Sequence, residues 1–332
     1  MSIRVLSPGL LTTVQDLGRH GHQRDGIPVA GAMDVFALRM ANILVGNAEE
    51  CAGIEITLAG PTLSFDADAL IALTGAEFDA MANGERAPAW RPLRVPAGAT
   101  LSLPRAARGC RAYLSVAGGI DVPLVLGSRS TYLRASLGGK DGRALDRDDV
   151  LDHLVPAPLS RSIAARVAAR RQGFGAASWG AGFSFARLYS TSPTVRLVSG
   201  EHMALLSEGA RAELWRAEFR VGVQSDRMGY RLEGPMLELS ERRELLSEAV
   251  TFGTVQLPPG GSPIVLMADR QTTGGYPRIG EVATVDHALL AQLKPGDGLR
   301  FRPVSLEEAQ RLYLAREAEL AQARAAIALN HR

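Results

Sequence analysis

Residues 269–273 place an acid, a guanidinium, an amide and two hydroxyls at consecutive positions. The apolar run 263–268 before them is typical of a buried strand, and Gly-Gly-Tyr-Pro at 274–277 predicts a turn after them. A strand that delivers such groups beside flexible backbone is a common way to build a site. We predict a site with Asp269, Arg270, Gln271 and Thr272 as catalytic residues and Thr273, Gly274, Gly275 and Tyr276 in substrate binding.

The chemistry of this stretch suits a carboxylated or amide-containing substrate. Arginine offers a planar fork to a carboxylate, and aspartate can act as a general base. Glutamine and threonine can orient an amide. The alternative is a polar hairpin end that only satisfies its own backbone.

Three further polar clusters lie at predicted loop ends, at residues 15–19, 129–131 and 226–227. Each combines arginine with aspartate or hydroxyl side chains, which can bind anionic or amide groups. From these clusters we predict Arg227 as a catalytic residue and assign to substrate binding Arg19, Arg129, Ser130, Thr131 and Asp226.

Motifs for phosphate binding and for a serine nucleophile are missing from the sequence. Residues 138–140 read Gly-Gly-Lys, but they lack the upstream glycine of a phosphate-binding loop and precede Asp141. No Gly-x-Ser-x-Gly elbow occurs, and Gly-Gly at 274–275 is not a dinucleotide fingerprint. His20 and His22 form the only close histidine pair, and without an evident third ligand we predict no metal site.

The bulk composition excludes other classes of function. A net charge of +2 over 332 residues provides no basic field for nucleic acid. No apolar run approaches the ~18 residues of a membrane span, and the N-terminus lacks the pattern of a signal peptide. We therefore expect a cytoplasmic protein in which Cys51 and Cys110 are buried free thiols.

Short sequence anchors recur in the same order in the two halves of the chain. Four ordered anchors indicate two related domains in tandem, and chance similarity of short β motifs is the alternative. The matched pairs are 3–7 with 195–199, 58–63 with 232–237, 116–119 with 272–275 and, more weakly, 148–151 with 296–299.

Short predicted strands separated by Gly and Pro turns predominate, which favours a mainly β fold of barrels or sandwiches with a few helices. Asp34 is predicted to cap a helix over about 35–45. Further helices are predicted near 204–217 and 285–293, and the capping box 305–308 predicts the start of a C-terminal helix.

Composition divides the chain into four parts. The Pro-, Ala/Arg- and Gly/Ser-rich stretch 156–192 is typical of a linker. We expect a first domain at 1–155, a second at 193–304 and the C-terminal helix at 305–332.

The chain resembles the allophanate hydrolase subunit 2 type, the second half of the carboxyltransferase domain of urea carboxylase, a family that also has members in prokaryotic 5-oxoprolinase. The resemblance adds Asp34 and Asn42 to the predicted substrate-binding residues. Ala30 departs from the serine expected before Gly-x-Met-Asp. The resemblance covers residues 2–303 and rests on motifs at 26–34, 41–47, 117–123, 126–131, 225–229 and 268–277.

The resemblance implies two tandem cyclophilin-like β-barrel domains, in agreement with the repeat. It also implies two partner proteins of the 5-oxoprolinase complex, a B component of the subunit 1 type and a separate A component. Such a complex opens 5-oxoproline to glutamate with hydrolysis of ATP. This chain would then be part of a hydrolase acting on a cyclic amide, with the ATP site not wholly in this chain.

Two alternatives stay open. One is the carboxyltransferase half of a biotin-dependent urea or amide carboxylase, with biotin on another chain because neither Lys140 nor Lys294 lies between methionines. The other is a non-catalytic regulator that binds a kinase-inhibitor homologue of the subunit 1 type. The intact residues 269–271 favour an enzyme.

Overall fold

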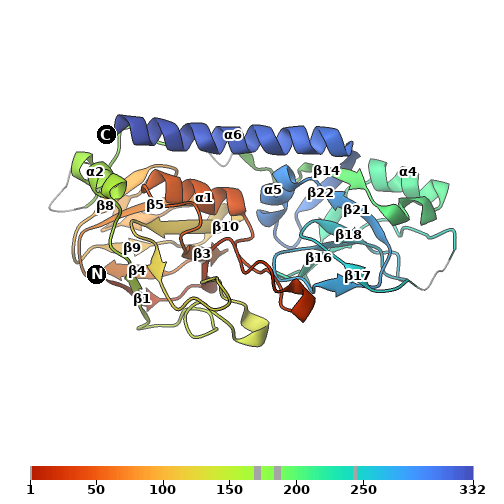
Figure 1. Ribbon diagram of the computed structural model, residues 1–332, viewed down its shortest axis with the longest axis horizontal. Coiled ribbons are helices and arrows are strands. Elements are labelled where there is room, and N and C mark those ends of the chain that lie inside the picture. The colour runs from red at the N-terminus through yellow and green to blue at the C-terminus, as the bar shows by residue number, and fades with distance from the viewer. Residues whose placement is uncertain (1, 168–172, 183–187, 242–244, 332) are drawn as a thin grey trace. The chain divides into compact units, whose positions relative to one another are not determined.

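The computed structural model describes residues 2–167, 173–182, 188–241 and 245–331 (Figure 1). The chain forms two compact units. Unit 1 comprises Met1–Arg19, Asp34–Leu188 and Glu319–Arg332, and unit 2 comprises His20–Met33 and Tyr189–Ala318. No helix in the described ranges is both long and apolar enough to cross a membrane.

Unit 1 contains two antiparallel sheets. The strands of the first are β1 Ser2–Ser7, β4 Thr62–Phe65, β6 Met81–Ala82, β7 Glu85–Arg86, β9 Thr100–Ser102, β11 Ile120–Asp121 and β12 Val150–His153. Those of the second are β2 Leu11–Gln15, β3 Gly53–Thr57, β5 Ala69–Phe78, β8 Pro92–Val95, β10 Ala106–Val116 and β13 Gly175–Ala176. The strand orders are β11-β12-β1-β4-β9-β6-β7 and β13-β8-β5-β10-β3-β2.

Alternating apolar residues build the core of unit 1. In the register of β1 and β4, Ile3 lies opposite Phe65 and Val5 opposite Leu63. Directly opposed residues of an antiparallel pair point to the same face, so these four side chains enter one core cluster.

Helix α1, Val35–Leu44, packs on β5 and β10. Its start confirms the predicted cap, because the Asp34 carboxylate accepts a hydrogen bond from the Ala37 N–H at 2.9 Å. The helix buries most of its residues. It therefore covers the outer side of strands whose residues are buried on both faces.

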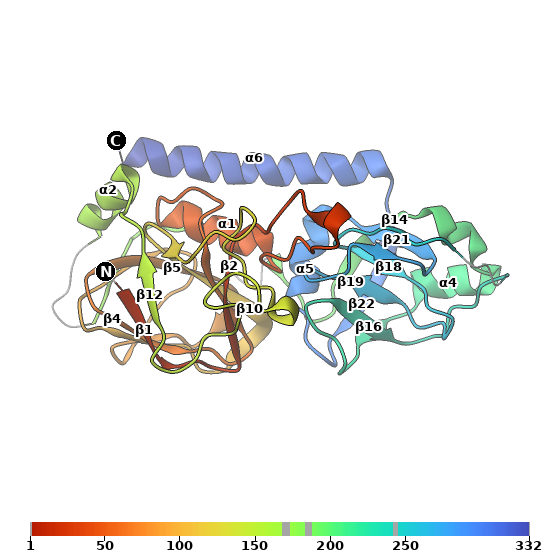
Figure 2. The ribbon, with the colours of Figure 1, turned by 60° about the horizontal axis from the view of Figure 1, so that its bottom comes forward.

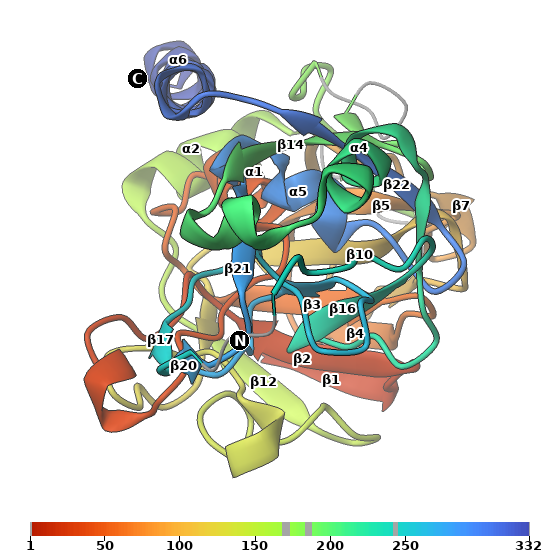
Figure 3. The ribbon, with the colours of Figure 1, turned by 90° about the vertical axis from the view of Figure 1, so that its right-hand side faces the viewer.

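Unit 2 is built around a closed barrel (Figure 3). The strand order is β14-β21-β18-β19-β16-β15-β22, with β14 and β22 paired in parallel. The bounds are β14 Thr194–Ser199, β15 Phe219–Val221, β16 Gly229–Glu233, β18 Thr254–Gln256, β19 Ile264–Leu266, β21 Arg278–Val282 and β22 Gly298–Pro303.

The barrel interior of unit 2 is apolar. Val255 lies opposite Val265, and the rings of Phe219 and Phe301 are 5.8 Å apart between centroids. All four belong to the core cluster of this unit. Because Val255 points inward, its neighbours Thr254 and Gln256 point to the outer face of the barrel.

A short ribbon accompanies the barrel. Strands β17, Glu248–Ala249, and β20, Thr273–Gly274, pair antiparallel as a separate two-stranded sheet (Figure 3). We call these four residues the β17–β20 ribbon. It carries part of the polar stretch at 269–277.

The remaining helices are α2 Pro158–Arg166, α4 Glu208–Arg216, α5 His287–Ala291 and α6 Leu306–Asn330. The helix predicted near 204–217 is interrupted: residues 201–205 form a 3-10 turn, and the Ser207 hydroxyl caps α4. The C-terminal helix is confirmed as α6, one uninterrupted helix (Figure 2). The Ser305 hydroxyl accepts from the Glu308 N–H at 3.2 Å, one half of the predicted capping box.

The predicted mainly β fold with a few helices is confirmed. Unit 2 contains the expected barrel, whereas the described strands of unit 1 form two separate sheets. The first repeat anchors lie in β1 and β14, the first strands of the two units. The repeat and the domain boundaries drawn from the sequence stay proposals.

Candidate functional site

Arg227 and Asp269 form a buried bidentate ion pair in unit 2. The Arg227 Nε and one terminal nitrogen each lie 2.9 Å from a different oxygen of Asp269. The two side chains are 7% and 5% exposed. The same terminal nitrogen donates to the carbonyl oxygen of Gly31 at 2.6 Å. The pair therefore links the segment around Gly31 to the barrel of unit 2.

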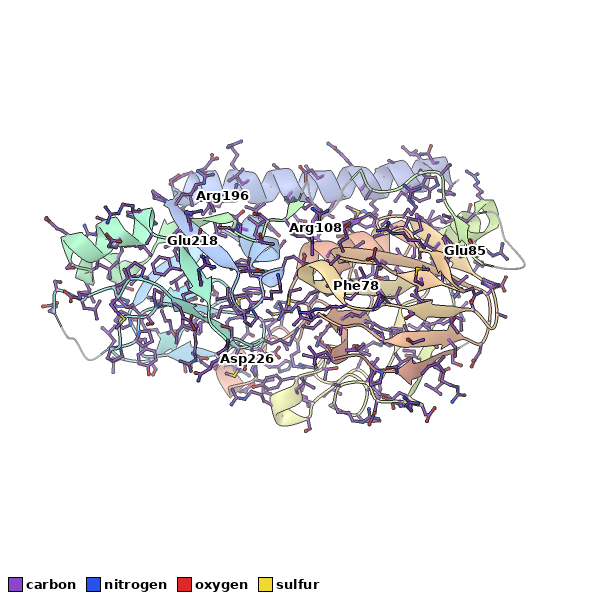
Figure 4. The ribbon with its side chains drawn as sticks, turned by 180° about the vertical axis from the view of Figure 1, so that it is seen from behind. Phe78, Glu85, Arg108, Arg196, Glu218 and Asp226 are labelled. Atoms are coloured by element: carbon purple, nitrogen blue, oxygen red, sulfur yellow. The ribbon has the colours of Figure 1, made fainter. Side chains whose placement is uncertain are left out.

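The backbone holds this pair in place. The Asp269 N–H donates to the Arg227 carbonyl at 2.8 Å, and the Met267 N–H donates to the Met228 carbonyl at 2.9 Å. Exposed Asp226, labelled in Figure 4, closes the turn by accepting from the Met228 N–H at 2.8 Å. The loop before β16 and the end of β19 are thus joined at the predicted catalytic residues.

Arg270, the next residue, is half-buried and forms no ion pair within the described part of the chain. Among the described residues, its guanidinium donates to the carbonyl oxygens of Val250, Met267 and Ala268, each at 3.4 Å. Burial lowers the pKa of Arg270, against the attraction of Glu281 and Asp269. A cation with three long contacts keeps hydrogen-bonding capacity for a ligand.

Glu281 on β21 lies beside this cation. Its carboxylate accepts from the hydroxyls of Thr251 and Thr254, both at 2.8 Å. Burial raises the pKa of the Glu281 carboxyl, and the threonine hydrogen bonds oppose that effect. Glu281 is therefore positioned by threonines rather than by an arginine.

Gln256 and Arg278 are opposed across β18 and β21. Gln256 is 1% exposed, and its Nε2 has no acceptor in the described structure. The Arg278 Nε is likewise buried without an acceptor. The terminal nitrogen of Arg278 pairs with Glu248 and, at 3.3 Å, with Glu201.

The other residues of the polar stretch lie in and around the ribbon. Thr272 is half-buried, and its carbonyl accepts from the Val250 N–H at 3.1 Å. Gln271 and Thr273 are exposed. Gly275 and Tyr276 line a groove of about 1160 Å³ that Met236 and Pro258 also border. The stretch thus divides between a buried pair, a half-buried cation and an exposed loop.

His287 begins α5 and stacks on Phe252, with ring centroids 4.3 Å apart. One ring nitrogen lies 3.2 Å from the Val282 carbonyl oxygen. The pKa of His287 is lowered to about 4, mainly by burial and in smaller part by Arg270, while the Val282 contact opposes the shift. The imidazole is therefore neutral at physiological pH.

Two predicted clusters of unit 1 meet around Asp16. Its carboxylate accepts from the Gly18 N–H at 2.8 Å, the Arg129 N–H at 2.6 Å, the Ser128 hydroxyl at 2.6 Å and the Ser130 hydroxyl. Four donors bind one buried carboxylate, and we call this hydrogen-bonded group the Asp16 cluster. It connects the loop after β11 to the end of β2.

The neighbouring predicted residues hydrogen-bond to the same two segments as the Asp16 cluster. Buried Arg19 donates to the Ser130 carbonyl, and the Thr131 hydroxyl donates to the Val14 carbonyl at 3.0 Å. The Arg129 side chain reaches Asp121 at 3.3 Å. The structure therefore brings Arg19, Ser130 and Thr131 together, where each bonds to other groups of the protein.

Asp34 and Asn42 are not part of the Asp16 cluster and lie at the two ends of α1. Asn42 donates to the carbonyls of Glu49 at 3.1 Å and Cys51 at 2.7 Å. The Asp34 N–H donates to the Tyr113 hydroxyl at 2.7 Å, which donates to Glu55 at 2.6 Å. Burial, with Glu55 and Asp34 nearby, raises the pKa of Tyr113 well above its usual value.

Four polar residues near the predicted site were not predicted from the sequence: Gln256, Arg278, Glu281 and His287. A glutamine inside the apolar strand 253–257 was the available signal, because a polar side chain at a buried strand position needs a partner. The clustering itself depends on the pairing of β18 with β21, which no local pattern predicts.

The glycines at 138 and 139 do not form a nucleotide cradle. A Cβ at either position would overlap Ser130 or Thr131, and Lys140 lies 3.9 Å from Asp141. These residues do not fit a phosphate-binding loop. In the described ranges no three His, Cys, Asp or Glu side chains are grouped to hold a metal ion, and the cysteines form no disulfide.

A comparison with known proteins identifies a family whose sequences match this chain. The family described as carboxyltransferase domain, subdomain A and B, matches residues 25–303. The chain is 41% identical to the C subunit of Escherichia coli 5-oxoprolinase over 309 residues, covering 92% of this chain and 93% of that protein. It is 40% identical to the C subunit of Haemophilus influenzae 5-oxoprolinase, covering 97% of each.

A solved structure gives the same fold. The crystal structure of the K. lactis urea amidolyase matches with a TM-score of 0.85 at 29% identity, over 97% of this chain and 20% of that one. The chain thus corresponds to about one fifth of that larger enzyme.

Proposed function

The chain belongs to the family of the carboxyltransferase domain, subdomains A and B, and from this premise we propose that it is the C subunit of an ATP-dependent 5-oxoprolinase. Such an enzyme hydrolyses the lactam of 5-oxoproline to L-glutamate. The observation that carries the proposal is the 40–41% identity to two proteins named as this component of 5-oxoprolinase. The similarity extends over nearly the whole length of this chain and of each relative.

The residues of unit 2 suit this chemistry. 5-Oxoproline carries a carboxylate and a lactam carbonyl, and its product carries two carboxylates. Arg270, Gln256 and Arg278 offer N–H donors that are incompletely used by the residues that the structure describes. Arginine and amide donors are what such oxygens require. The Arg227–Asp269 pair, by contrast, supports the loop that surrounds these donors.

The proposed complex includes the B component, of the subunit 1 type, and the A component, in the cytoplasm. Relatives that are each named as one subunit of 5-oxoprolinase imply that other subunits exist. ATP would bind at those subunits or at an interface with them, because the Gly-Gly-Lys loop of this chain does not fit a nucleotide. Neither lysine is expected to carry biotin.

The test is glutamate release by the assembled complex. This chain is co-purified with the products of its neighbouring genes and incubated with 5-oxoproline, with and without ATP. We expect L-glutamate only when ATP is present. A complex that assembles fully and releases no glutamate contradicts the proposal.

The family name and the urea amidolyase relatives favour one second candidate, a carboxyltransferase half that accepts carboxyl groups from biotin on another chain. The same assay separates the two. Avidin, which sequesters biotin, should leave glutamate release unchanged for a 5-oxoprolinase. Avidin-sensitive consumption of bicarbonate and a urea-like amide would instead identify the carboxyltransferase.

A further inference from the structure

We infer that the outer face of β18 and β21, beneath the β17–β20 ribbon, binds a carboxylate of the substrate through Gln256, Arg278 and Arg270. The identity of that carboxylate, on 5-oxoproline or glutamate, rests on the proposed function. The site consists of donors on one face of unit 2 that lack acceptors among the described residues.

Gln256 provides the first observation. It is 1% exposed, yet its Nε2 has no acceptor among the described residues. Leaving a buried donor unpaired destabilises the folded state, so native proteins rarely do so without a reason. Gln256 occupies a strand position where an apolar residue would fill the same space without that cost.

Arg278 provides the second, independent observation. It is the register partner of Gln256, so the two side chains lie on the same face of the sheet. Its Nε is also buried and has no acceptor in the described part of the chain, although its terminal nitrogen binds Glu248 and Glu201. Two unused donors therefore lie next to each other.

Arg270 completes the set. Glu281 and Asp269 attract its guanidinium from a distance, but no carboxylate of the described residues hydrogen-bonds to it, and its three contacts to carbonyl oxygens are each 3.4 Å long. The acids near this face are already engaged: Glu281 by Thr251 and Thr254, and Glu248 by Arg278. The three unused groups are donors that cannot accept a hydrogen bond, which excludes a cation and favours a carboxylate.

Gly274 shows how the site is covered. A Cβ at this position would lie 2.4 Å from the Gln256 Nε2, so the ribbon passes directly over the unused donor. Only two residue pairs join the ribbon strands, and so short a ribbon is marginally stable by itself. Ligand entry therefore requires the ribbon to move away from Gln256.

The experiment uses calorimetric binding to the assembled complex, which does not depend on turnover. Ligands are 5-oxoproline, L-glutamate and 2-pyrrolidinone, the lactam that lacks the carboxylate. Variants of this chain are Gln256→Met, which keeps the length of the side chain, and Arg270→Gln. The matched control is Arg108→Gln, which removes an arginine from an exposed ion pair with Glu77 in unit 1.

We expect 5-oxoproline to bind the wild-type and Arg108→Gln complexes equally. Gln256→Met and Arg270→Gln should weaken its binding about tenfold or more, and 2-pyrrolidinone should bind the wild type at least about tenfold more weakly. The Gln256→Met chain should melt at the same temperature as wild type or higher, because an unpaired buried donor has been removed.

Three results overturn the inference. One is unchanged binding by both variants while the complex still releases glutamate, which leaves the proposed function intact. Another is a marked loss of thermal stability in Gln256→Met, which would show that Nε2 has a partner within the protein. The last is absence of 5-oxoproline and glutamate binding altogether, which removes the proposed function as well. Variant-sensitive binding without turnover would support the site and contradict only the function.

Discussion

At the scale of residues, the structure separates two kinds of polar group within one sequence cluster. Asp269 and Arg227 satisfy each other and hold the Gly31 carbonyl. Arg270, their neighbour, has only long contacts. Their catalytic roles stay predictions, but the geometry argues that Asp269 and Arg227 first stabilise unit 2.

Asp269→Ala should therefore destabilise the chain by about 3–5 kcal/mol, because the Arg227 charge remains buried without its partner. Chemical unfolding of the full chain measures this. The control is Asp79→Ala, which breaks a pair with Arg86 whose side chains are 71% and 62% exposed and should cost less than about 1 kcal/mol. Equal, small costs for both variants would contradict the structural role of Asp269.

The lowered pKa of His287 predicts that the stability of the fold depends on pH. Its folded pKa of about 4 lies below the ordinary value of 6.5, so the unfolded chain binds more protons between these values. Stability should be fully present above about pH 6.5 and decrease as the pH falls toward 4, by up to about 3 kcal/mol. Glu281, whose pKa is raised by burial, contributes with the opposite sign.

The contribution of His287 is isolated by comparison with His287→Phe, which keeps a ring against Phe252. Urea unfolding at pH 4.5 and pH 7 should show a smaller difference in the variant than in the wild type. The same pH difference in both chains would assign the acid sensitivity to other groups.

At the scale of elements, the sequence predicted where polar clusters begin better than what they bind. The clusters at 15–19 and 129–131 were identified, but their meeting around Asp16 depends on a pairing between residues more than 100 positions apart. Because four donors bind the Asp16 carboxylate, the Asp16 cluster stabilises the fold. No local sequence pattern distinguishes such a structural cluster from a binding site.

Local capping and strand signals were more informative. The Asp34 cap and the C-terminal helix follow from short-range chemistry and are confirmed. The interruption of the helix near 204–217 was missed, because residues 201–205 turn more tightly and Ser207 opens a new helix. The pairing of β17 with β20 was also beyond local reasoning, since each strand has two residues.

The glycine at position 118, in the motif 117–123, allows a close backbone contact whose contribution to stability can be measured. Gly118 has a φ of +97°, and a Cβ there would lie 2.0 Å from the Leu154 carbonyl oxygen. Gly127, at +77°, has open space around it. Gly118→Ala should cost about 1–3 kcal/mol more than Gly127→Ala, because only the first adds overlap with backbone to the left-handed strain.

Thermal unfolding of the two alanine variants measures this difference. Equal melting temperatures would mean that the Gly118 turn relaxes freely. The motif would then need a role other than permitting the close approach of residue 154.

At the scale of the whole molecule, the fold and the family agree, and we propose that the activity depends on partner subunits. The chain matches about one fifth of a urea amidolyase but nearly the whole of the two 5-oxoprolinase relatives. The donors on one face of unit 2 that lack acceptors among the described residues support the proposed contribution to substrate binding within a complex.

The most direct measurement is an add-back titration. The other proteins of the complex are purified without this chain, and increasing amounts of it are added while ATP-dependent release of L-glutamate from 5-oxoproline is followed. We predict no release without the chain and a rate that rises and saturates as the complex fills. The same rate with and without the chain, when assembly is verified, would contradict its assignment as a component needed for ring opening.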